Sequence, residues 1–280
     1  MRIMVLGNAQ RQGVMEEAKQ LLPFLREHCE VVIDDLLQSQ DLSKVNADIA
    51  LVLGGDGAIL RAARQMGYRQ TPVLGVNLGK LGFLADLNPD EVREVFPAVL
   101  SGQYQVTQHL MFECALHDRD SGEESTYLGL NEVTVQTGPP FPIIQLDLLI
   151  NGEKVSRYNG DGLMLSTPIG STAHNLSAGG PILGQDLAAF VITPICPHSL
   201  TARPLVDSAE KEYMIAIQGE DSHAMLRIDG QETIPLTNRH RVTVRKARVN
   251  FSLVKVPGKS YYQTLKDKLN WGSLPVYREE

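Results

Sequence analysis

The first hundred residues alternate short apolar runs with longer segments of helical periodicity. Four apolar runs predict buried strands: Arg2–Gly7, Cys29–Ile33, Ile49–Leu53 and Val73–Val76. Three other segments repeat apolar residues at helical spacing and predict helices: Val14–Glu27, Ala58–Met66 and Asn88–Gly102. Strands that alternate with helices are typical of a parallel sheet with flanking helices. We therefore expect an α/β domain over residues 1–103.

After Gly102 the apolar runs shorten and lie between turn-rich pieces such as the Asn151-Gly152 hairpin signal. The runs that predict strands are Val106–His117, Tyr127–Val135, Ile143–Ile150, Val155–Tyr158, Gly162–Ser166, Ala188–Thr193, Tyr213–Gln218, Ala224–Ile228 and Arg241–Val256. We expect a β-rich domain over residues 104–259. Tyr261–Trp271 has helical character, so we expect the segment 260–280 to return to the first domain.

The composition is that of a soluble globular protein, with 280 residues, 43% hydrophobic and 21% charged. A net charge of −7 disfavours binding to nucleic acid or to an anionic membrane. Apolar runs are too short to span a bilayer. Cys29, Cys114 and Cys196 are isolated and odd in number, so neither a zinc ribbon nor a disulfide framework is indicated. We expect a cytoplasmic location.

A glycine-rich turn follows the third predicted strand. Gly54, Gly55, Asp56 and Gly57 stand between the strand Ile49–Leu53 and a helix, where backbone N–H groups can approach phosphate oxygens. Asp56 repels phosphate but is suited to accept a hydroxyl proton or to hold a divalent cation. A plain tight turn, with Asp-Gly supplying a positive φ, is the alternative. The spacing matches neither a P-loop nor the Rossmann fingerprint.

Two further segments combine small or polar residues with apolar strands. In Asp161–Leu183, hydroxyls and amides crowd around Gly170–Thr172 and suit a sugar or phosphate, although a helix cap with a Gly-Pro exit explains most of them. Asn131 and Glu132 interrupt an apolar strand and fit ribose hydroxyls or an adenine edge. A strand edge or bulge is the alternative for that pair. His198, Arg203 and the Asp229–Gln231 turn allow either interpretation.

In their order along the chain, these segments resemble the bacterial NAD kinase family, also called ATP/polyphosphate NAD kinases. The resemblance is carried by GGDGAILRAAR (54–64), NLGKLGFLA (77–85), LNEVTV (130–135), DGLMLSTPIGSTAHNLSAGGPIL (161–183), ITPICPHSLTARPLV (192–206) and IDGQ (228–231). It implies an α/β N-terminal and a β-rich C-terminal domain with the site between them, a homodimer or homotetramer, NAD and ATP as substrates, and a divalent cation such as Mg²⁺.

The resemblance also assigns roles to residues. Asp56 would take the proton from the adenosine 2′-hydroxyl of NAD, and Gly54, Gly55 and Gly57 would line the same turn. The implied dinucleotide-binding residues are Asn131, Glu132, Asn159, Asp161, Thr172, Ala173, His174, Asn175, Leu176 and Ser177, and Arg61 and Gln231 match further binding positions. No metal ligand is assigned. The chain departs from the family at His174, where Tyr is usual, and at Asn159, where many members carry a basic residue.

Two other functions fit parts of the sequence. A GGDG lipid kinase would need an apolar acyl pocket and affinity for membranes, which the acidic net charge and the polar residues 170–177 oppose. A catalytically silent dinucleotide sensor would have no need of Asp56. The expected reaction is phosphoryl transfer, in which the glycine turn and a divalent cation hold the donor phosphates while Asp56 orients the hydroxyl and accepts its proton.

Overall fold

The chain forms two compact units in the computed structural model, which describes residues 1–79, 82–219 and 223–272. Unit 1 contains residues 1–65, 71–107 and those from Ser252 onward, and unit 2 contains residues 66–70 and 108–251. The strands β5 (Gln105–Asp118) and β16 (His240–Lys255) belong to both units. The division therefore falls inside these strands, whereas the sequence placed it at 103/104 and 259/260. Residues 273–280 of the expected C-terminal segment lie outside the described residues, as do Lys80 and Leu81.

Unit 1 is built on a parallel sheet. Its strand order is β2 (Glu30–Asp35), β1 (Arg2–Gly7), β3 (Ile49–Leu53) and β4 (Val73–Val76). The end of β16 extends this sheet, with Leu253 opposite Val73 in a parallel pair. β1, β3 and β4 are almost entirely apolar because both faces of the sheet are covered by helices, whereas the edge strand β2 carries Glu30, Asp34 and Asp35.

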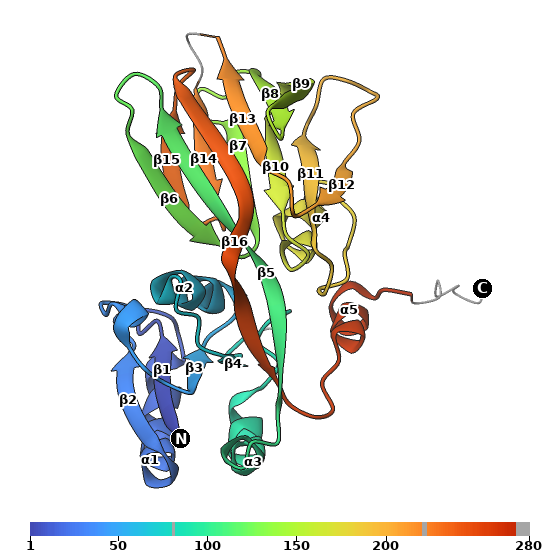
Figure 1. Ribbon diagram of the computed structural model, residues 1–280. Coiled ribbons are helices and arrows are strands. Elements are labelled where there is room, and N and C mark those ends of the chain that lie inside the picture. The colour runs from blue at the N-terminus through green and yellow to red at the C-terminus, as the bar shows by residue number, and fades with distance from the viewer. Residues whose placement is uncertain (80–81, 220–222, 273–280) are drawn as a thin grey trace, which may run out of the picture. The chain divides into compact units, whose positions relative to one another are not determined.

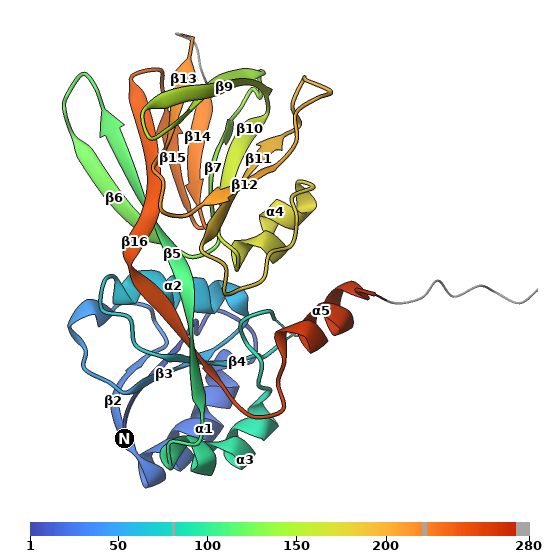
Figure 2. The same ribbon diagram turned by 45° about the vertical axis from the view of Figure 1, so that its right-hand side comes forward.

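Helices cover the two faces of this sheet unequally (Figures 1 and 2). Helices α1 (Val14–His28) and α3 (Pro89–Leu100) pack on one face and share a core with Val5 and Leu51. Helix α2 (Asp56–Met66) lies on the other face, where a Cβ at Gly75 would come within 2.7 Å of Ile59 Cδ1. Glycine on β4 thus lets α2 sit close to the sheet. A further helix, α5 (Tyr261–Leu269), follows β16.

Unit 2 is a pair of packed sheets, which can be followed by their labels in Figure 2. One contains β16, β13 (Tyr213–Gln218), β8 (Ile144–Ile150) and β9 (Glu153–Gly160) in that order, with β5 and β6 (Glu124–Gly129) attached. The other has the order β12 (Leu205–Ser208), β11 (Ala189–Ile195), β10 (Gly162–Ser166), β7 (Glu132–Thr137), β14 (Ala224–Ile228) and β15 (Glu232–Leu236). Inward-facing residues of both sheets, such as Phe112, Val133 and Tyr213, form one core.

The α/β N-terminal domain and the β-rich C-terminal domain predicted from the sequence are confirmed, with three local corrections. The predicted strand Tyr127–Val135 is two strands, β6 and β7, with Leu130 and Asn131 between them. The strands β12 and β15 were missed. β12 has only four residues, and β15 contains Pro235, which is tolerated because β15 is an edge strand.

Candidate functional site

The glycine turn of unit 1 joins β3 to α2 with little space for side chains. Gly54 has φ +140°, and its N–H donates to the carbonyl of Val76 at 2.8 Å. A Cβ at Gly54 would lie 2.9 Å from the Cβ of Ala58. The helix begins at Asp56, two residues before the predicted start, so Gly57 lies in its first turn. The positive φ expected from Asp-Gly is therefore found at Gly54 instead, where a residue with a side chain would be strained.

Asp56 is held by a segment 27 to 29 residues further along the chain. Its Oδ2 accepts the N–H of Phe83 at 2.8 Å, and its Oδ1 accepts those of Leu84 and Ala85 at 3.0 and 3.4 Å. A Cβ at Gly82 would lie 2.1 Å from Oδ1. An ionised carboxylate has about four acceptor positions, so these three bonds fix its orientation and leave capacity for a hydroxyl donor. Arg61 lies further along α2 and is exposed.

In unit 2 a second aspartate, Asp229, also accepts hydrogen bonds from several consecutive backbone N–H groups. Asp229 has 5% of its surface exposed, and its Oδ1 accepts the N–H groups of Leu130, Asn131 and Glu132 at 3.2, 2.8 and 3.2 Å. Its own N–H donates to the carbonyl of Glu132 at 2.9 Å. These bonds interrupt the strand between β6 and β7. The polar pair recognised in the sequence is thus a break between strands that is fixed by the Asp229–Gln231 turn.

The side chains of Asn131 and Glu132 remain available for a ligand. Within the described part of the chain, the side-chain amide of Asn131 forms no hydrogen bond, and Oε2 of Glu132 is buried without a partner. Burial first, and then the negative charge of Asp229, raise the pKa of Glu132 to about 8, and Arg227 acts in the opposite direction. Glu132 is therefore largely a neutral acid at pH 7, able to donate a hydrogen bond as well as to accept one. Gln231 is half-buried in the adjoining turn.

The segment Gly170–Ser177 packs directly on this break. It forms a 3₁₀ turn (Gly170–Thr172) and the short helix α4 (His174–Ser177). A Cβ at Gly170 would lie 2.1 Å from the carbonyl oxygen of Asn131, so the two backbones are in contact. The hydroxyl of Thr167 donates to the carbonyl of Leu130 at 2.5 Å. The structure thus brings Asn131, Glu132 and this segment together.

The candidate residues of this segment differ in what they offer a ligand. Asn175 is fully buried: its Nδ2 donates to the carbonyls of Ser171 and Pro181 at 3.2 and 3.0 Å, and its Oδ1 accepts from Thr193 at 2.6 Å. Its amide therefore stabilises the segment. His174 and Ser177 are exposed, whereas Thr172, Ala173 and Leu176 are half-buried.

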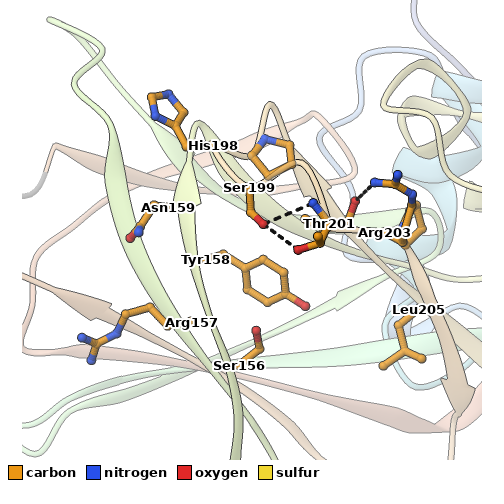
Figure 3. A pocket seen from close by; sticks show the side chains of 12 residues that line it. Ser156, Arg157, Tyr158, Asn159, His198, Ser199, Thr201, Arg203 and Leu205 are labelled. Atoms are coloured by element: carbon orange, nitrogen blue, oxygen red, sulfur yellow. Dashed lines mark hydrogen bonds between the residues drawn. The ribbon is translucent and has the colours of Figure 1, made fainter.

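Asn159, near the end of β9, lines a cavity of about 510 Å³ (Figure 3), and Asp161 directly follows this strand. In the figure Tyr158 points between Ser156 and Leu205, while Arg157 and Asn159 extend to the other side of the strand, as alternation along β9 requires. The N–H of Asp161 donates to the carbonyl of Ile195 at 3.0 Å. A hydrogen bond from the Cys196 thiol to the Asp161 carboxylate raises the pKa of that thiol. The sequence drew no connection between these two residues.

Family models match both halves of this chain. A model described as the ATP-NAD kinase N-terminal domain matches residues 3–104, and one described as the ATP-NAD kinase C-terminal domain matches residues 130–256. The chain belongs to the NAD kinase family. An NAD kinase of Rhodopirellula baltica is 44% identical over 278 residues, which is 99% of this chain and 89% of that one. The GGDG lipid kinase alternative is thereby excluded, and the protein is an NAD kinase.

Two solved structures share the fold of this NAD kinase. Yeast NADH kinase complexed with NADH has a TM-score of 0.88 at 24% identity and covers 99% of this chain and 90% of that one. An NAD kinase from Archaeoglobus fulgidus in complex with ATP has a TM-score of 0.78 at 25% identity and covers 96% of this chain and 99% of that one. No helix among the described residues of the kinase has the length and apolar character needed to cross a membrane.

Proposed function

We propose that this NAD kinase transfers a phosphoryl group from ATP to the adenosine 2′-hydroxyl of NAD, with Asp56 accepting the hydroxyl proton. The observation that carries the role of Asp56 is its anchoring by three backbone N–H groups beside the glycine turn. The hydroxyl oxygen forms a bond to the γ-phosphorus, the bond to the β-γ bridging oxygen breaks, and ADP leaves while the proton passes to Asp56. A fixed carboxylate needs no reorganisation at that moment.

The dinucleotide is assigned to unit 2. Asn131 and Glu132 present side-chain groups without partners in the described residues, from a turn that Asp229 holds rigidly. We assign to the same ligand Asp161, Asn159, Gln231 and the segment Thr172–Ser177, in which Asn175 acts by holding the segment in place. Gly54, Gly55, Gly57 and Arg61 are assigned to nucleotide phosphates, which the N-terminus of α2 favours.

We assign the divalent cation to the phosphoryl donor, ATP. The described residues contain no group of three or more His, Cys, Asp or Glu side chains placed to hold a metal ion. Mg²⁺ is commonly bound by one or two carboxylates together with substrate phosphates, and Asp56 is the carboxylate at the turn. We therefore write the donor as the Mg²⁺ complex of ATP, in which the cation neutralises phosphate charge.

The proposal includes a homo-oligomer in the cytoplasm. The edge strand β12 exposes Leu205 and Val206, and Leu200 before it is 94% exposed. Apolar residues clustered at a sheet edge suit a subunit interface. The three cysteines are free, which fits a reducing compartment. Sedimentation velocity at micromolar concentration tests the oligomer, and a single monomer species contradicts it.

Product formation is the direct test of the activity. The protein is incubated with NAD, ATP and Mg²⁺, and NADP is measured by an NADP-specific dehydrogenase. We expect NADP to form in proportion to enzyme and not to form with Asp56→Ala. A wild-type protein that binds NAD without forming NADP would instead be the silent sensor. The absence of both binding and product would contradict the whole assignment.

A further inference from the structure

One face of β7 carries polar side chains that the described residues leave unsatisfied. Val133 and Val135 point into the core, so Glu132 and Thr134 point to the opposite face. Glu132 is 6% and Thr134 is 2% exposed, yet Oε2 of Glu132 and Oγ1 of Thr134 have no hydrogen-bond partner there. Buried polar atoms are normally paired, so this face carries hydrogen-bonding capacity that the described residues do not use.

Arg227 stands on the same face of the neighbouring strand. It lies directly opposite Thr134 in the antiparallel pair of β14 and β7, and Glu132 is its diagonal neighbour. In the part of the chain that the structure describes, Arg227 forms no ion pair, and its Nη2 makes one long hydrogen bond of 3.4 Å to the carbonyl of Gly230. Most donors of its guanidinium are therefore available.

The described groups that face Arg227 do not neutralise its positive charge. The carboxylate of Asp229 is used by backbone N–H groups, and the raised pKa of Glu132 keeps that side chain largely neutral at pH 7. Partial burial, and then the charge of Arg227 itself, lower the pKa of His174. Arg227 is thus a charged donor among groups that are neutral or already bonded.

We propose that Arg227 is a further nucleotide-binding residue, which donates hydrogen bonds to the pyrophosphate of the dinucleotide. A guanidinium matches two phosphate oxygens at once, and Arg227 is a half-buried cation on this face with donors to spare. The choice of the dinucleotide over ATP rests on the proposed function, because Glu132 and His174, which Arg227 faces, are assigned to that ligand.

Calorimetric titration with ligands that differ in phosphate content tests the inference. NAD and ADP-ribose carry the pyrophosphate, adenosine carries none, and ATP represents the donor. For Arg227→Met we expect the Kd of NAD and ADP-ribose to rise about 10- to 100-fold, with Kd values of adenosine and ATP within about twofold of wild type. For Arg227→Lys, the Kd values of NAD and ADP-ribose should lie between those of wild type and of Arg227→Met, because lysine keeps the positive charge but lacks the planar guanidinium. The matched control is Arg119→Met, at an exposed arginine after β5, and it should bind like wild type.

Each alternative result overturns the inference. Unchanged binding of ADP-ribose by Arg227→Met removes the contact, an equal loss for adenosine assigns Arg227 a structural role, and a loss confined to ATP moves it to the donor. Should Arg227→Met fail to fold, as judged by circular dichroism, Arg227→Gln replaces it in the same series. These measurements need no turnover, so a failure of the inference is separate from a failure of NADP formation.

Discussion

A methyl group at Gly82 would lie 2.1 Å from the carboxylate oxygen Oδ1 of Asp56, which is inside van der Waals contact. Glycine at this position is therefore what allows the backbone of residues 83–85 to close on Asp56 and hold it. The position of the proposed proton acceptor depends on a residue without a side chain in a separate loop.

Gly82→Ala should lower kcat about 100-fold, because it displaces the carboxylate by a distance on the order of an ångström. The matched control is Gly79→Ala in the same loop, where a Cβ would come no closer than 4.0 Å to Oδ1 of Asn77. We expect the control to keep most of its activity. Steady-state kinetics with thermal melting would check this, and a Gly82→Ala enzyme with wild-type kcat would show that the fixed carboxylate is not needed.

Asp56→Asn should lower kcat by at least about 100-fold with little change in the Kd of NAD. One oxygen becomes an NH₂ group that faces the N–H of Phe83 or of Leu84, so the variant should also lose about 1–3 kcal/mol of stability. Urea denaturation and calorimetric binding separate the two effects. Near-normal turnover would refute the role of Asp56 as proton acceptor.

Asn131→Ala should raise KM for NAD about tenfold and leave KM for ATP nearly unchanged, because the lost side chain is proposed to bind only NAD. The turn itself should persist, because the backbone N–H of residue 131 still donates to Asp229. Asn175→Ala is the contrasting variant. It removes bonds to Ser171, Pro181 and Thr193, so we expect a loss of about 1–3 kcal/mol in stability. An Asn131→Ala effect equal for both substrates would instead indicate a folding defect, and one confined to ATP would move Asn131 to the donor.

Glu132→Gln should change how the stability of the free enzyme depends on pH. The folded state raises the pKa of Glu132 from 4.5 to about 8, so the folded state binds its proton more tightly. The resulting stability is complete below pH 4.5 and is lost as the pH rises through 8. Relative to the variant, wild type should lose about 1.4 kcal/mol per pH unit within that window in urea denaturation. Parallel stability curves would mean that Glu132 is ionised in the folded protein.

His174→Tyr should retain activity and remove a pH dependence of KM for NAD. An unperturbed imidazole, with a pKa of about 6.5, would place that dependence between about pH 6 and 7.5. The partial burial of its ring, and then the charge of Arg227, lower the pKa of His174, so we expect the change below pH 6.5. Superimposable KM curves for wild type and variant from pH 5 to 8 would show that His174 does not contact the nucleotide.

The sequence predicted features that depend on local patterning and missed those that depend on distant hydrogen bonds. Apolar runs and a glycine turn located β3 and α2, because period and turn chemistry are local properties. The anchoring of Asp56 by residues 83–85, and of residues 130–132 by Asp229, links segments that no local pattern connects. Arg227 was overlooked because its placement beside Glu132 follows only from the pairing of β14 with β7.

The bonds between Asp229 and residues 130–132 also bear on how unit 2 folds. They join positions 97 to 99 residues apart, so closing this loop carries an entropic cost that the pairing of β7 with β14 helps to offset. We therefore expect the turn that carries Asn131 and Glu132 to become fixed only once β14 has paired with β7. A nascent chain that ends before residue 224 still lacks β14 and Asp229, so it has the residues proposed to contact the nucleotide without the aspartate that fixes them.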